Sequence, residues 1–317
     1  MKLAIEAGRF GFEAGRIPKK TLRLSEQPDG RNEPIMTGRS EETGHSMDMA
    51  VPKVLTIAGS DSGGGAGIQA DLKTFQELGA FGMSVITAVT AQNTLGVQGV
   101  YPLPVEAVVR QMDSIGEDLE PQAVKTGMLF SGEIIEAVAG KICSYGWRGL
   151  VVDPVMTAKG GAALLRDDAV EAVCRHLLPL AKVVTPNIPE AEALANMSIH
   201  SMKDRVEAAK RIHALGPEYV LIKGGHADEQ AVAEDLLYDG AASYTFTGER
   251  VKTKDTHGTG CTFAAAIAAE LAKGASVRQA AGTAKHFIQA AIAHPLGIGG
   301  GHGPANHWPT GNTPGAT

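Results

Sequence analysis

The chain lacks most of the features that mark secreted, membrane-embedded and nucleic-acid-binding proteins. Its 317 residues include three cysteines, Cys143, Cys174 and Cys261, too few and too scattered for a disulfide scaffold or a zinc site. No apolar run reaches the roughly 18 residues that a membrane-spanning helix needs. The formal net charge is −6, whereas non-specific nucleic-acid binding needs clustered lysine and arginine. We therefore expect a cytoplasmic protein that acts on a small molecule and binds neither nucleic acid nor membrane.

Glycine, by contrast, is abundant. Glycine makes up 39 of the 317 residues, about 12% of the chain, whereas roughly 7% is usual in proteins. They follow no fixed period, which excludes a collagen-like chain. They gather instead in short loops, where glycine lets the backbone approach a ligand closely. These loops are candidate binding sites.

The chain divides into two parts near residue 50. Residues 1–50 show no sustained hydrophobic period, and we expect them to be a disordered extension. Either Met47 or Met49 is a candidate for the natural start. Residues 51–317 form the second part, which we expect to be one folded domain.

The second part has the pattern of an α/β domain with a mostly parallel sheet. Apolar strands that alternate with helices form a sheet whose two faces are both covered by helices, and this arrangement is a three-layer sandwich. An antiparallel hairpin is expected at a sheet edge, at residues 234–252. The expected strands are residues 54–58, 84–91, 149–153, 181–185 and 219–223, and the expected helices are residues 67–78, 104–116, 131–145, 167–178, 203–215, 261–272 and 277–293.

Polar or glycine residues form six clusters that we take as strand ends, five at the strands named above and one at residues 125–127. In open parallel sheets, ligands bind beyond the carboxyl ends of the strands. The sequence therefore predicts a binding site at this edge of the sheet. The six clusters are residues 59–61, 92–93, 125–127, 153, 185–187 and 223–225.

The first glycine cluster, residues 59–67, is not a P-loop, because the required Gly-Lys-Ser/Thr is missing. Residues 65–70 do match G-x-G-x-x-A, a fingerprint of dinucleotide-binding proteins. That fingerprint also needs an acidic residue at the end of the next strand, and here the strand ends in Gln92 and Asn93. An NAD-binding oxidoreductase is therefore a weak alternative, and a flexible turn before a helix is the simpler interpretation.

The second glycine cluster, residues 253–261, directly precedes an alanine-rich helix. The first amides of a helix have no intrahelical acceptor, and the helix dipole is positive there. Gly258, Gly260 and Cys261 would then form an anion hole for a phosphoryl group in transit. A thiol at this position is expected to have a lowered pKa and to deprotonate a nearby hydroxyl. The alternative is a glycine helix cap with an inert cysteine, and the spacing alone does not decide between them.

A candidate Mg²⁺ site follows two other strands. Asn187 and Glu190 share one face of a first helical turn, and Asp153 ends a neighbouring strand. Carboxylate and amide oxygens suit Mg²⁺, directly or through water. Lys159, in the loop after Asp153, would meet phosphate. Taken singly, each of these is an ordinary helix start or a solvated loop charge.

Together these strings resemble the ribokinase-like superfamily and, within it, the hydroxymethylpyrimidine/phosphomethylpyrimidine kinases of thiamine biosynthesis. The similarity runs from about Lys53 to Trp308 and leaves out residues 1–50. It implies a ribokinase-like three-layer sandwich. The matching strings, in chain order, are residues 56–61, 66–75, 84–88, 91–94, 125–129, 153–156, 185–187, 223–226, 256–261 and 301–304.

The resemblance implies a kinase that uses ATP and Mg²⁺. Such enzymes phosphorylate the hydroxymethyl group of 4-amino-5-hydroxymethyl-2-methylpyrimidine and then convert the monophosphate to the diphosphate. Gln92 would hold the pyrimidine, since an amide both donates and accepts hydrogen bonds. Gly59, Thr90 and Met128 match other pocket positions. Asp71 would bind the hydroxyl or the exocyclic amine, or else cap its helix.

The resemblance also assigns the catalytic, metal and nucleotide positions. Cys261 stands, beside Gly258 and Gly260, where many relatives have an aspartate base. Asp153 and Glu190, together with Asn187, would organise Mg²⁺ and its waters. The loop at 154–162 would close as a lid that brings Lys159 to the phosphates. The expected nucleotide-binding residues are Lys159, Thr185, Asn187, Lys223, Thr256 and His257.

Other interpretations remain open. The nearest rival is a pyridoxal kinase, because some relatives with the same cysteine motif accept vitamin B6 alcohols, although Gln92 favours the pyrimidine. A non-catalytic regulator on this fold is disfavoured by the intact motif at 258–261. The resemblance suggests a homodimer. The sequence does not decide whether K⁺ assists the reaction or whether both phosphorylations occur.

Overall fold

The computed structural model describes residues 51–156, 167–225 and 232–308. The strands in these ranges form one nine-stranded sheet in the order β3-β2-β1-β4-β5-β6-β7-β8-β9. Six strands, from β2 to β7 in that order, run parallel, and β3, β8 and β9 pair antiparallel. The strands are β1 (Lys53–Asp61), β2 (Phe81–Asn93), β3 (Gly96–Pro102), β4 (Ala123–Thr126), β5 (Leu150–Val152), β6 (Val183–Val184), β7 (Tyr219–Ile222), β8 (Val232–Tyr238) and β9 (Ser243–Glu249).

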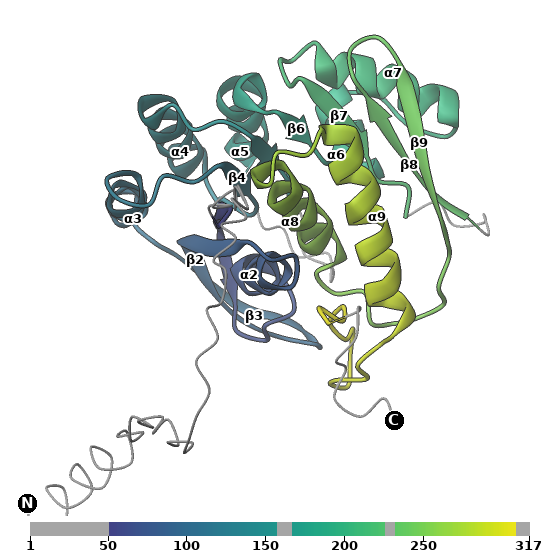
Figure 1. Cartoon of the computed structure of the whole chain (residues 1–317), viewed down its shortest axis with the longest axis horizontal. Coiled ribbons are helices and arrows are strands. Elements are labelled where there is room, and N and C mark those ends of the chain that lie inside the picture. The colour runs from purple at the N-terminus through teal and green to yellow at the C-terminus, as the bar shows by residue number, and fades with distance from the viewer. Residues whose placement is uncertain (1–50, 157–166, 226–231, 309–317) are drawn as a thin grey trace, which may run out of the picture. The chain divides into compact units, whose positions relative to one another are not determined.

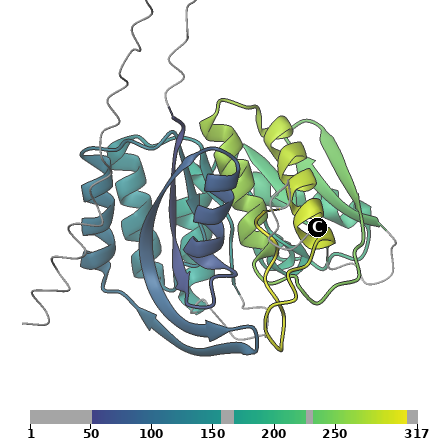
Figure 2. The same ribbon diagram turned by 60° about the horizontal axis from the view of Figure 1, so that its bottom comes forward.

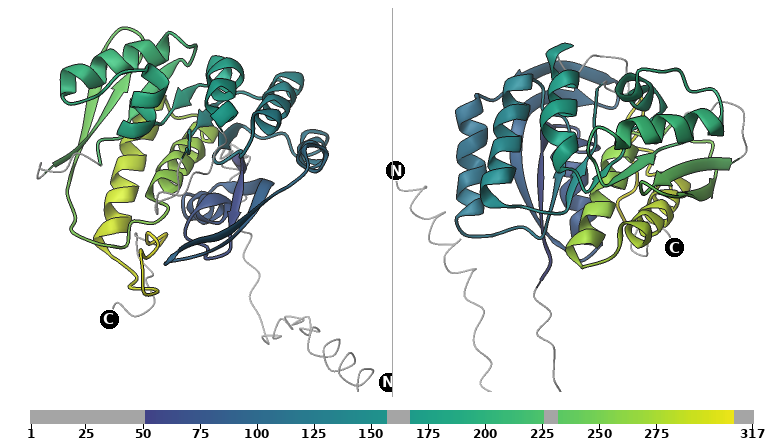
Figure 3. Two further views of the ribbon diagram at one scale, coloured as in Figure 1. Left: turned by 180° about the vertical axis from the view of Figure 1, so that it is seen from behind. Right: turned by 90° about the horizontal axis from the view of Figure 1, so that it is seen from above.

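Helices cover both faces of this sheet, as Figures 1 and 3 show. One face carries α2, α8 and α9, and the other carries α3 to α7. The predicted three-layer α/β sandwich is thereby confirmed. The helices are α2 (Gly67–Glu77), α3 (Val105–Gly116), α4 (Gly132–Tyr145), α5 (Asp167–Ala172), α6 (Ile188–Ala195), α7 (Met202–His213), α8 (Thr259–Ala272) and α9 (Val277–Ala293), with short π- and 3₁₀-helical turns at Val173–Leu177 and Leu178–Leu180.

The two cores follow from the alternation of side chains along each strand. In β1, Leu55 and Ile57 belong to the core that includes residues of α3 and α4. Val54, on the opposite face of the same strand, belongs to the core that includes Phe75 of α2 and Phe263 of α8. Strands buried on both faces are apolar throughout, which is why they were visible in the sequence.

Helix α8 lies between α2 and α9 against the sheet (Figure 1). Residues 264–269, five alanines and Ile267, have no exposed surface. A helix that is apolar all round is stable only when neighbours cover every side. This burial fixes the position of the helix start, which carries the second glycine cluster.

The C-terminal loop, residues 294–308, ties two distant segments together. The His302 amide donates to the carbonyl oxygen of Thr94 at the tip of the β2–β3 hairpin (2.8 Å), and the Ala305 amide donates to that of His257 (3.1 Å). Figure 2 shows the end of this hairpin beside the yellow C-terminal segment. The turn before α8 and the hairpin are thus held close to each other.

Some features differ from the sequence-based expectations or fall outside the described residues. Strand β3 was not indicated, because Gly96 and Gly99 weaken its strand pattern. The helix expected at 167–178 loses its α-helical form after Ala172 and ends at a turn that contains Pro179. The expected extension at 1–50, and Lys159 with most of its loop, lie outside the described residues. None of the described helices is both long and apolar enough to cross a membrane.

Candidate active site

A cavity of about 690 Å³ lies at the carboxyl ends of the parallel strands. The ends of β1 and β2, the segments that follow β4, β5, β6 and β7, and the turn that opens α8 all contribute to its lining. The convergence of polar strand ends is as expected from the sequence. The cavity brings together Gly59, Thr90, Gln92, Met128, Asp153, Asn187, Glu190, Lys223, Thr256, His257, Gly258, Gly260 and Cys261. Asp71 and Thr185 lie outside this lining.

The start of α8 forms a cradle of backbone amides at the cavity wall. Gly258 caps the helix with φ of 78°, and neither a side-chain cap nor an acidic residue occupies the first turn. A Cβ at Gly258 would overlap the carbonyl oxygen of Gly65, so only glycine lets these two loops pack. The amides of Gly260 and Cys261 have no acceptor within the helix. Together with the helix dipole they form a site for an anion.

The pKa of the Cys261 thiol differs from the one expected from the sequence. Burial raises the pKa of its thiol to about 11, and the carboxylates of Asp71 and Asp153 act in the same direction, against the attraction of Lys125. The expected lowering of this pKa is wrong, because desolvation outweighs the helix terminus. The thiol is therefore the main form at neutral pH.

An ion pair without exposed surface lies under the cavity. The Lys125 Nζ is 2.9 Å from Asp71 Oδ2, which also accepts a hydrogen bond from the Thr56 hydroxyl at 2.6 Å. Burial alone would lower the pKa of Lys125, but Asp71 raises it, so the lysine is charged. Asp71 sits inside α2, whose N-cap is Ala66. The expectation that Asp71 caps the helix is wrong, and its contact with the cavity runs through Lys125.

A second buried charge pair adjoins the cradle. Lys223 Nζ lies 2.8 Å from Asp153 Oδ1, and the Thr185 hydroxyl donates to the same oxygen at 3.2 Å. Although burial opposes it, the ammonium groups of Lys223 and Lys125 lower the pKa of Asp153. Thr185, placed in the nucleotide groove from the sequence, is fully buried and instead orients Asp153.

The candidate metal residues fit a cation that is shared with a ligand. Asp153 Oδ2 is buried and has no hydrogen-bond partner among the described residues. Burial, reinforced by Asp153, raises the pKa of Glu190 to about 7 against the attraction of Lys223. The described ranges hold no cluster of three or more His, Cys, Asp or Glu side chains that would bind a metal alone. Phosphate and water oxygens would therefore have to complete the coordination of Mg²⁺.

Asn187 and Glu190 form a capping box at the start of α6. The Asn187 side chain accepts the Glu190 amide at 2.9 Å, and the Glu190 carboxylate accepts the Asn187 amide at 2.9 Å. The ordinary helix start considered from the sequence is thus present. Glu190 also lines the cavity, and the backbone of Met156 lies within hydrogen-bond range of its carboxylate.

The first glycine cluster does not offer its amides to a ligand. The Asp61 carboxylate accepts hydrogen bonds from the amides of Gly63 (2.8 Å), Gly65 (3.1 Å) and Ala66 (2.8 Å). The protein's own anion thus fills the place that a pyrophosphate takes in dinucleotide-binding loops. This arrangement argues against the NAD-binding alternative.

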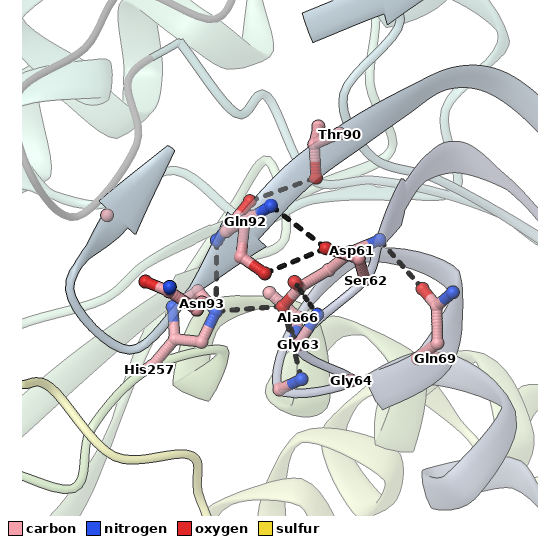
Figure 4. Close-up of polar contacts among 12 residues, drawn as sticks. Asp61, Ser62, Gly63, Gly64, Ala66, Gln69, Thr90, Gln92, Asn93 and His257 are labelled. Atoms are coloured by element: carbon pink, nitrogen blue, oxygen red, sulfur yellow. Dashed lines mark hydrogen bonds and ion pairs between the residues drawn. The ribbon is translucent and has the colours of Figure 1, made fainter. Parts of the chain in front are cut away.

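The part of the cavity around Gln92 contains a polar network (Figure 4). Gln92, at the end of β2, contacts Thr90 on its own strand and His257 in the turn before α8. His257, expected from the sequence among the nucleotide-binding residues, in turn contacts Asp61 at 2.9 Å, so its ring lies beside Gln92. Three segments far apart in the chain thereby meet at one amide side chain.

Comparison with known proteins decides the family. Residues 61–306 match the family model described as phosphomethylpyrimidine kinase. The chain belongs to this family. It is 56% identical over 260 residues to the hydroxymethylpyrimidine/phosphomethylpyrimidine kinase of Bacillus subtilis (strain 168), covering 82% of this chain and 96% of that protein. The resemblance inferred from the motifs, and the kinase activity that it implies, are confirmed.

Solved structures agree with the fold of this phosphomethylpyrimidine kinase family member. The phosphomethylpyrimidine kinase of Clostridium difficile 630 is 44% identical with a TM-score of 0.69, covering 76% of this chain and 99% of that one. An ADP complex of Bacillus subtilis pyridoxal kinase is 43% identical with a TM-score of 0.75, covering 81% and 98%. The ribokinase-like sandwich is thus shared with kinases named for two different substrates.

The kinase cavity extends to an end that the sequence did not reveal. Val251, Phe263, Ile288 and Ile292 line it with apolar side chains from α8, α9 and the segment before α8. Nearby, Lys285 Nζ lies 2.8 Å from Asp235 Oδ2. The residues on α9 have the spacing of an ordinary core face, so only the fold distinguishes them from packing residues.

Proposed function

We propose that this kinase transfers the terminal phosphoryl group of ATP to the hydroxymethyl oxygen of 4-amino-5-hydroxymethyl-2-methylpyrimidine, and then a second group to the monophosphate. The observation that carries the proposal is the amide cradle at Gly258–Cys261, in the wall of the cavity. Gln92 stands at one end, and the apolar wall of α9 stands at the other. An alcohol held by Gln92 and a nucleotide held against α9 would meet at the cradle.

The nucleotide end is assigned by chemistry. An adenine ring suits the apolar wall around Ile288 and Ile292. Lys223 and Thr256 line the same cavity and would contact the phosphates. Lys159 is proposed to reach the phosphates as well, on the sequence argument alone.

Asp153 and Glu190 would hold Mg²⁺ together with phosphate and water oxygens. The buried, unpartnered Oδ2 of Asp153 supports this assignment. The metal would neutralise part of the negative charge on the triphosphate. Asn187 would keep Glu190 in place through the capping box.

The transfer itself needs one bond to form and one to break. The alcohol oxygen attacks the terminal phosphorus while the bond to the bridging oxygen breaks and ADP leaves. Cys261, in its thiolate form, accepts the hydroxyl proton. In a loose transition state, positioning and charge stabilisation by the amides of Gly260 and Cys261 supply most of the rate.

Release of ADP from ATP tests the function. The purified protein is assayed first with the hydroxymethylpyrimidine and then with its monophosphate, each with and without Mg²⁺. We expect Mg²⁺-dependent turnover of both acceptors, and exchange of K⁺ for Na⁺ in the same assay tests the monovalent ion. Absence of turnover with both acceptors would refute the proposal.

A pyridoxal kinase is the second candidate, because structural relatives at 40–43% identity carry that name. Gln92 favours the aminopyrimidine, whose edge pairs with an amide through one donor and one acceptor. Side-by-side turnover of pyridoxine and the hydroxymethylpyrimidine separates the two. Faster turnover of pyridoxine would reverse the substrate assignment.

The oligomeric state is proposed to be a homodimer formed through the β2–β3 hairpin. Val89 and Tyr101 are cross-strand neighbours with 44% and 63% of their surface exposed, and Leu95 at the tip is 75% exposed. Exposed apolar side chains that adjoin one another favour association. Light scattering should give twice the chain mass, and Tyr101→Ser with Leu95→Ser should give monomer, whereas a monomeric parent protein would refute the assignment.

A further inference from the structure

The amide of Gln92 faces a conflict at His257. Its nitrogen Nε2 is placed 3.1 Å from His257 Nε2, and that ring nitrogen is 2.9 Å from Asp61 Oδ2 (Figure 4). If His257 Nε2 carries a proton, it can donate a hydrogen bond to Asp61, but this N–H group then also faces the NH₂ group of Gln92, and both are donors. Without that proton, a lone pair of the ring would face the carboxylate. One of the two contacts is unfavourable in either case.

A second conflict lies on the other side of the same amide. The Thr90 hydroxyl is 3.0 Å from the carbonyl oxygen of Ser60 and 3.2 Å from Gln92 Oε1. Both partners are acceptors, and a hydroxyl has one proton. Thr90 therefore cannot satisfy both with the amide placed in this way.

We propose that Asp61 and His257 act as positioning residues that hold the Gln92 amide turned over, with Oε1 toward His257 and the NH₂ group toward Thr90. The oxygen and nitrogen of an amide have nearly the same shape, so the surrounding donors and acceptors decide between the two orientations. After the turn, the ring N–H is shared between Asp61 and Gln92 Oε1. The amide donates to Thr90, and Thr90 donates to Ser60. Every contact is then favourable.

Asp61 is suited to fix the proton of His257. Its carboxylate is nearly buried and accepts three backbone amides, from Gly63, Gly65 and Ala66. Burial alone would raise the pKa of Asp61, but the hydrogen bonds from His257 and the backbone outweigh it and lower the pKa. An ionised carboxylate only accepts, so the ring nitrogen that faces it must carry a proton.

The orientation of the amide sets the orientation of the substrate. This step rests on the proposed function. The turned amide has one free lone pair on the His257 side and one free N–H on the Thr90 side. An aminopyrimidine offers a donor amine beside an acceptor ring nitrogen, so the amine would lie toward His257. The hydroxymethyl group, on the next ring carbon beyond the amine, would then point onward to the cradle at Gly258–Cys261.

The test uses a substrate with the opposite hydrogen-bond order. In 5-hydroxymethyl-2-methylpyrimidin-4-one the ring N–H donates and the 4-oxygen accepts, which mismatches the locked amide. We expect the wild-type kcat/KM to favour the amino alcohol at least about a hundredfold. In His257→Leu the amide of Gln92 is free to rotate, so the preference in kcat/KM for the amino alcohol over the oxo compound should fall about tenfold or more. The change should appear as a higher KM for the amino alcohol, with little change in the KM for ATP.

Two further variants separate positioning from general damage. His257→Gln carries an N–H that reaches the place of the ring Nε2, and it should restore the wild-type ratio. His302→Leu replaces an exposed histidine whose backbone, not its ring, bonds to Thr94, and it should behave as wild type.

The outcomes distinguish this inference from the proposed function. If His257→Leu phosphorylates the amino alcohol with an undiminished preference over the oxo compound, the inference is overturned and the function stands. If wild type phosphorylates neither alcohol, both fall. If His257→Leu does not fold, a crystal structure of wild type with the amino alcohol decides. An amine on the His257 side of Gln92 supports the inference, and an amine beside Thr90 overturns it.

Discussion

Lys125 and Asp71 place two opposite charges where neither has exposed surface. The sequence pointed to both, but for different reasons: Lys125 as a strand end and Asp71 as a substrate ligand. The two residues are 54 positions apart in the chain, so their pairing became visible only in the fold. The same holds for Thr185, whose hydroxyl lies on Asp153 instead of in the groove. Residue types at strand ends could be predicted, whereas the partners that cover them could not.

Removing one member of this pair should strongly destabilise the protein. Lys125→Met leaves an uncompensated buried carboxylate, and we expect the free energy of unfolding to fall by about 3–5 kcal/mol. Adding Asp71→Asn should recover much of that loss, since the unpaired charge is gone. Urea denaturation of the two variants measures both effects, and an unaltered midpoint for Lys125→Met would contradict the burial of this pair.

Cys261 should matter for the first phosphorylation more than for the second. An alcohol must lose a proton, whereas the attacking phosphate oxygen of the monophosphate is already ionised near neutral pH. Cys261→Ala should therefore lower kcat/KM for the alcohol at least about a hundredfold, and that for the monophosphate far less. The exposed Cys143 gives the control, and Cys143→Ala should match wild type. Equal losses in both steps would reduce Cys261 to a packing residue.

The pH profile of the same enzyme has a definite sign. Because the pKa of Cys261 is raised to about 11, the thiolate fraction grows with pH throughout the neutral and mildly alkaline range. The kcat/KM for the alcohol should rise between about pH 7 and pH 9, and Cys261→Ala should remove that rise. A falling or flat profile in the wild type would exclude the thiolate as base.

Among the elements, the start of α8 depends most on a single glycine. Gly258 has positive φ, and its Cα packs against the carbonyl group of Gly65 in the first glycine cluster. Two clusters that the sequence presented as separate candidate sites are thus one packed pair of loops. Only the second one offers free amides. The sequence located both clusters and the helix after each, but not the contact between them.

Gly258→Ala should disrupt this contact. Overlap with the Gly65 carbonyl and the strained backbone together predict a loss of about 2–5 kcal/mol in stability, with kcat lowered as the cradle shifts. Gly140→Ala in α4 is the matched control, since its Cβ would meet no atom within 4 Å. That change should be neutral or stabilise by up to about 1 kcal/mol. Comparable effects of the two substitutions on unfolding would contradict the packing described.

The C-terminal loop should make stability depend on pH through His307. This side chain is buried, 3.0 Å from the Thr262 hydroxyl of α8, and burial, aided by Lys73, lowers its pKa to about 4. Below pH 6.5 the unfolded chain takes up a proton that the folded ring refuses, so stability falls as the pH falls toward 4. At pH 5 this amounts to about 2 kcal/mol.

His307→Gln should remove that part of the acid sensitivity. Urea denaturation at pH 8 and pH 5 gives the change in unfolding free energy for wild type, His307→Gln and the exposed control His302→Gln. The His307 variant should lose about 2 kcal/mol less than the other two. Identical losses in all three proteins would show that His307 is protonated in the fold.

At the scale of the whole molecule, the nine-stranded sheet brings six strand ends to one edge and sets the start of α8 against them. The apolar, alternating pattern of the chain was enough to predict the sandwich and this edge. It was not enough to predict the nucleotide end, because the apolar residues of α9 have the spacing of a core helix. The resulting cavity is lined by Gln92 and by the apolar residues of α9, and the free amides at the start of α8 belong to the same cavity.

A crystal structure with Mg²⁺, a non-hydrolysable ATP analogue and 4-amino-5-hydroxymethyl-2-methylpyrimidine tests this account most directly. The terminal phosphate should accept hydrogen bonds from the amides of Gly260 and Cys261, with the hydroxymethyl oxygen of the alcohol in line behind it and the pyrimidine on Gln92. A terminal phosphate bound away from the start of α8, with the cradle amides facing only water, would contradict it.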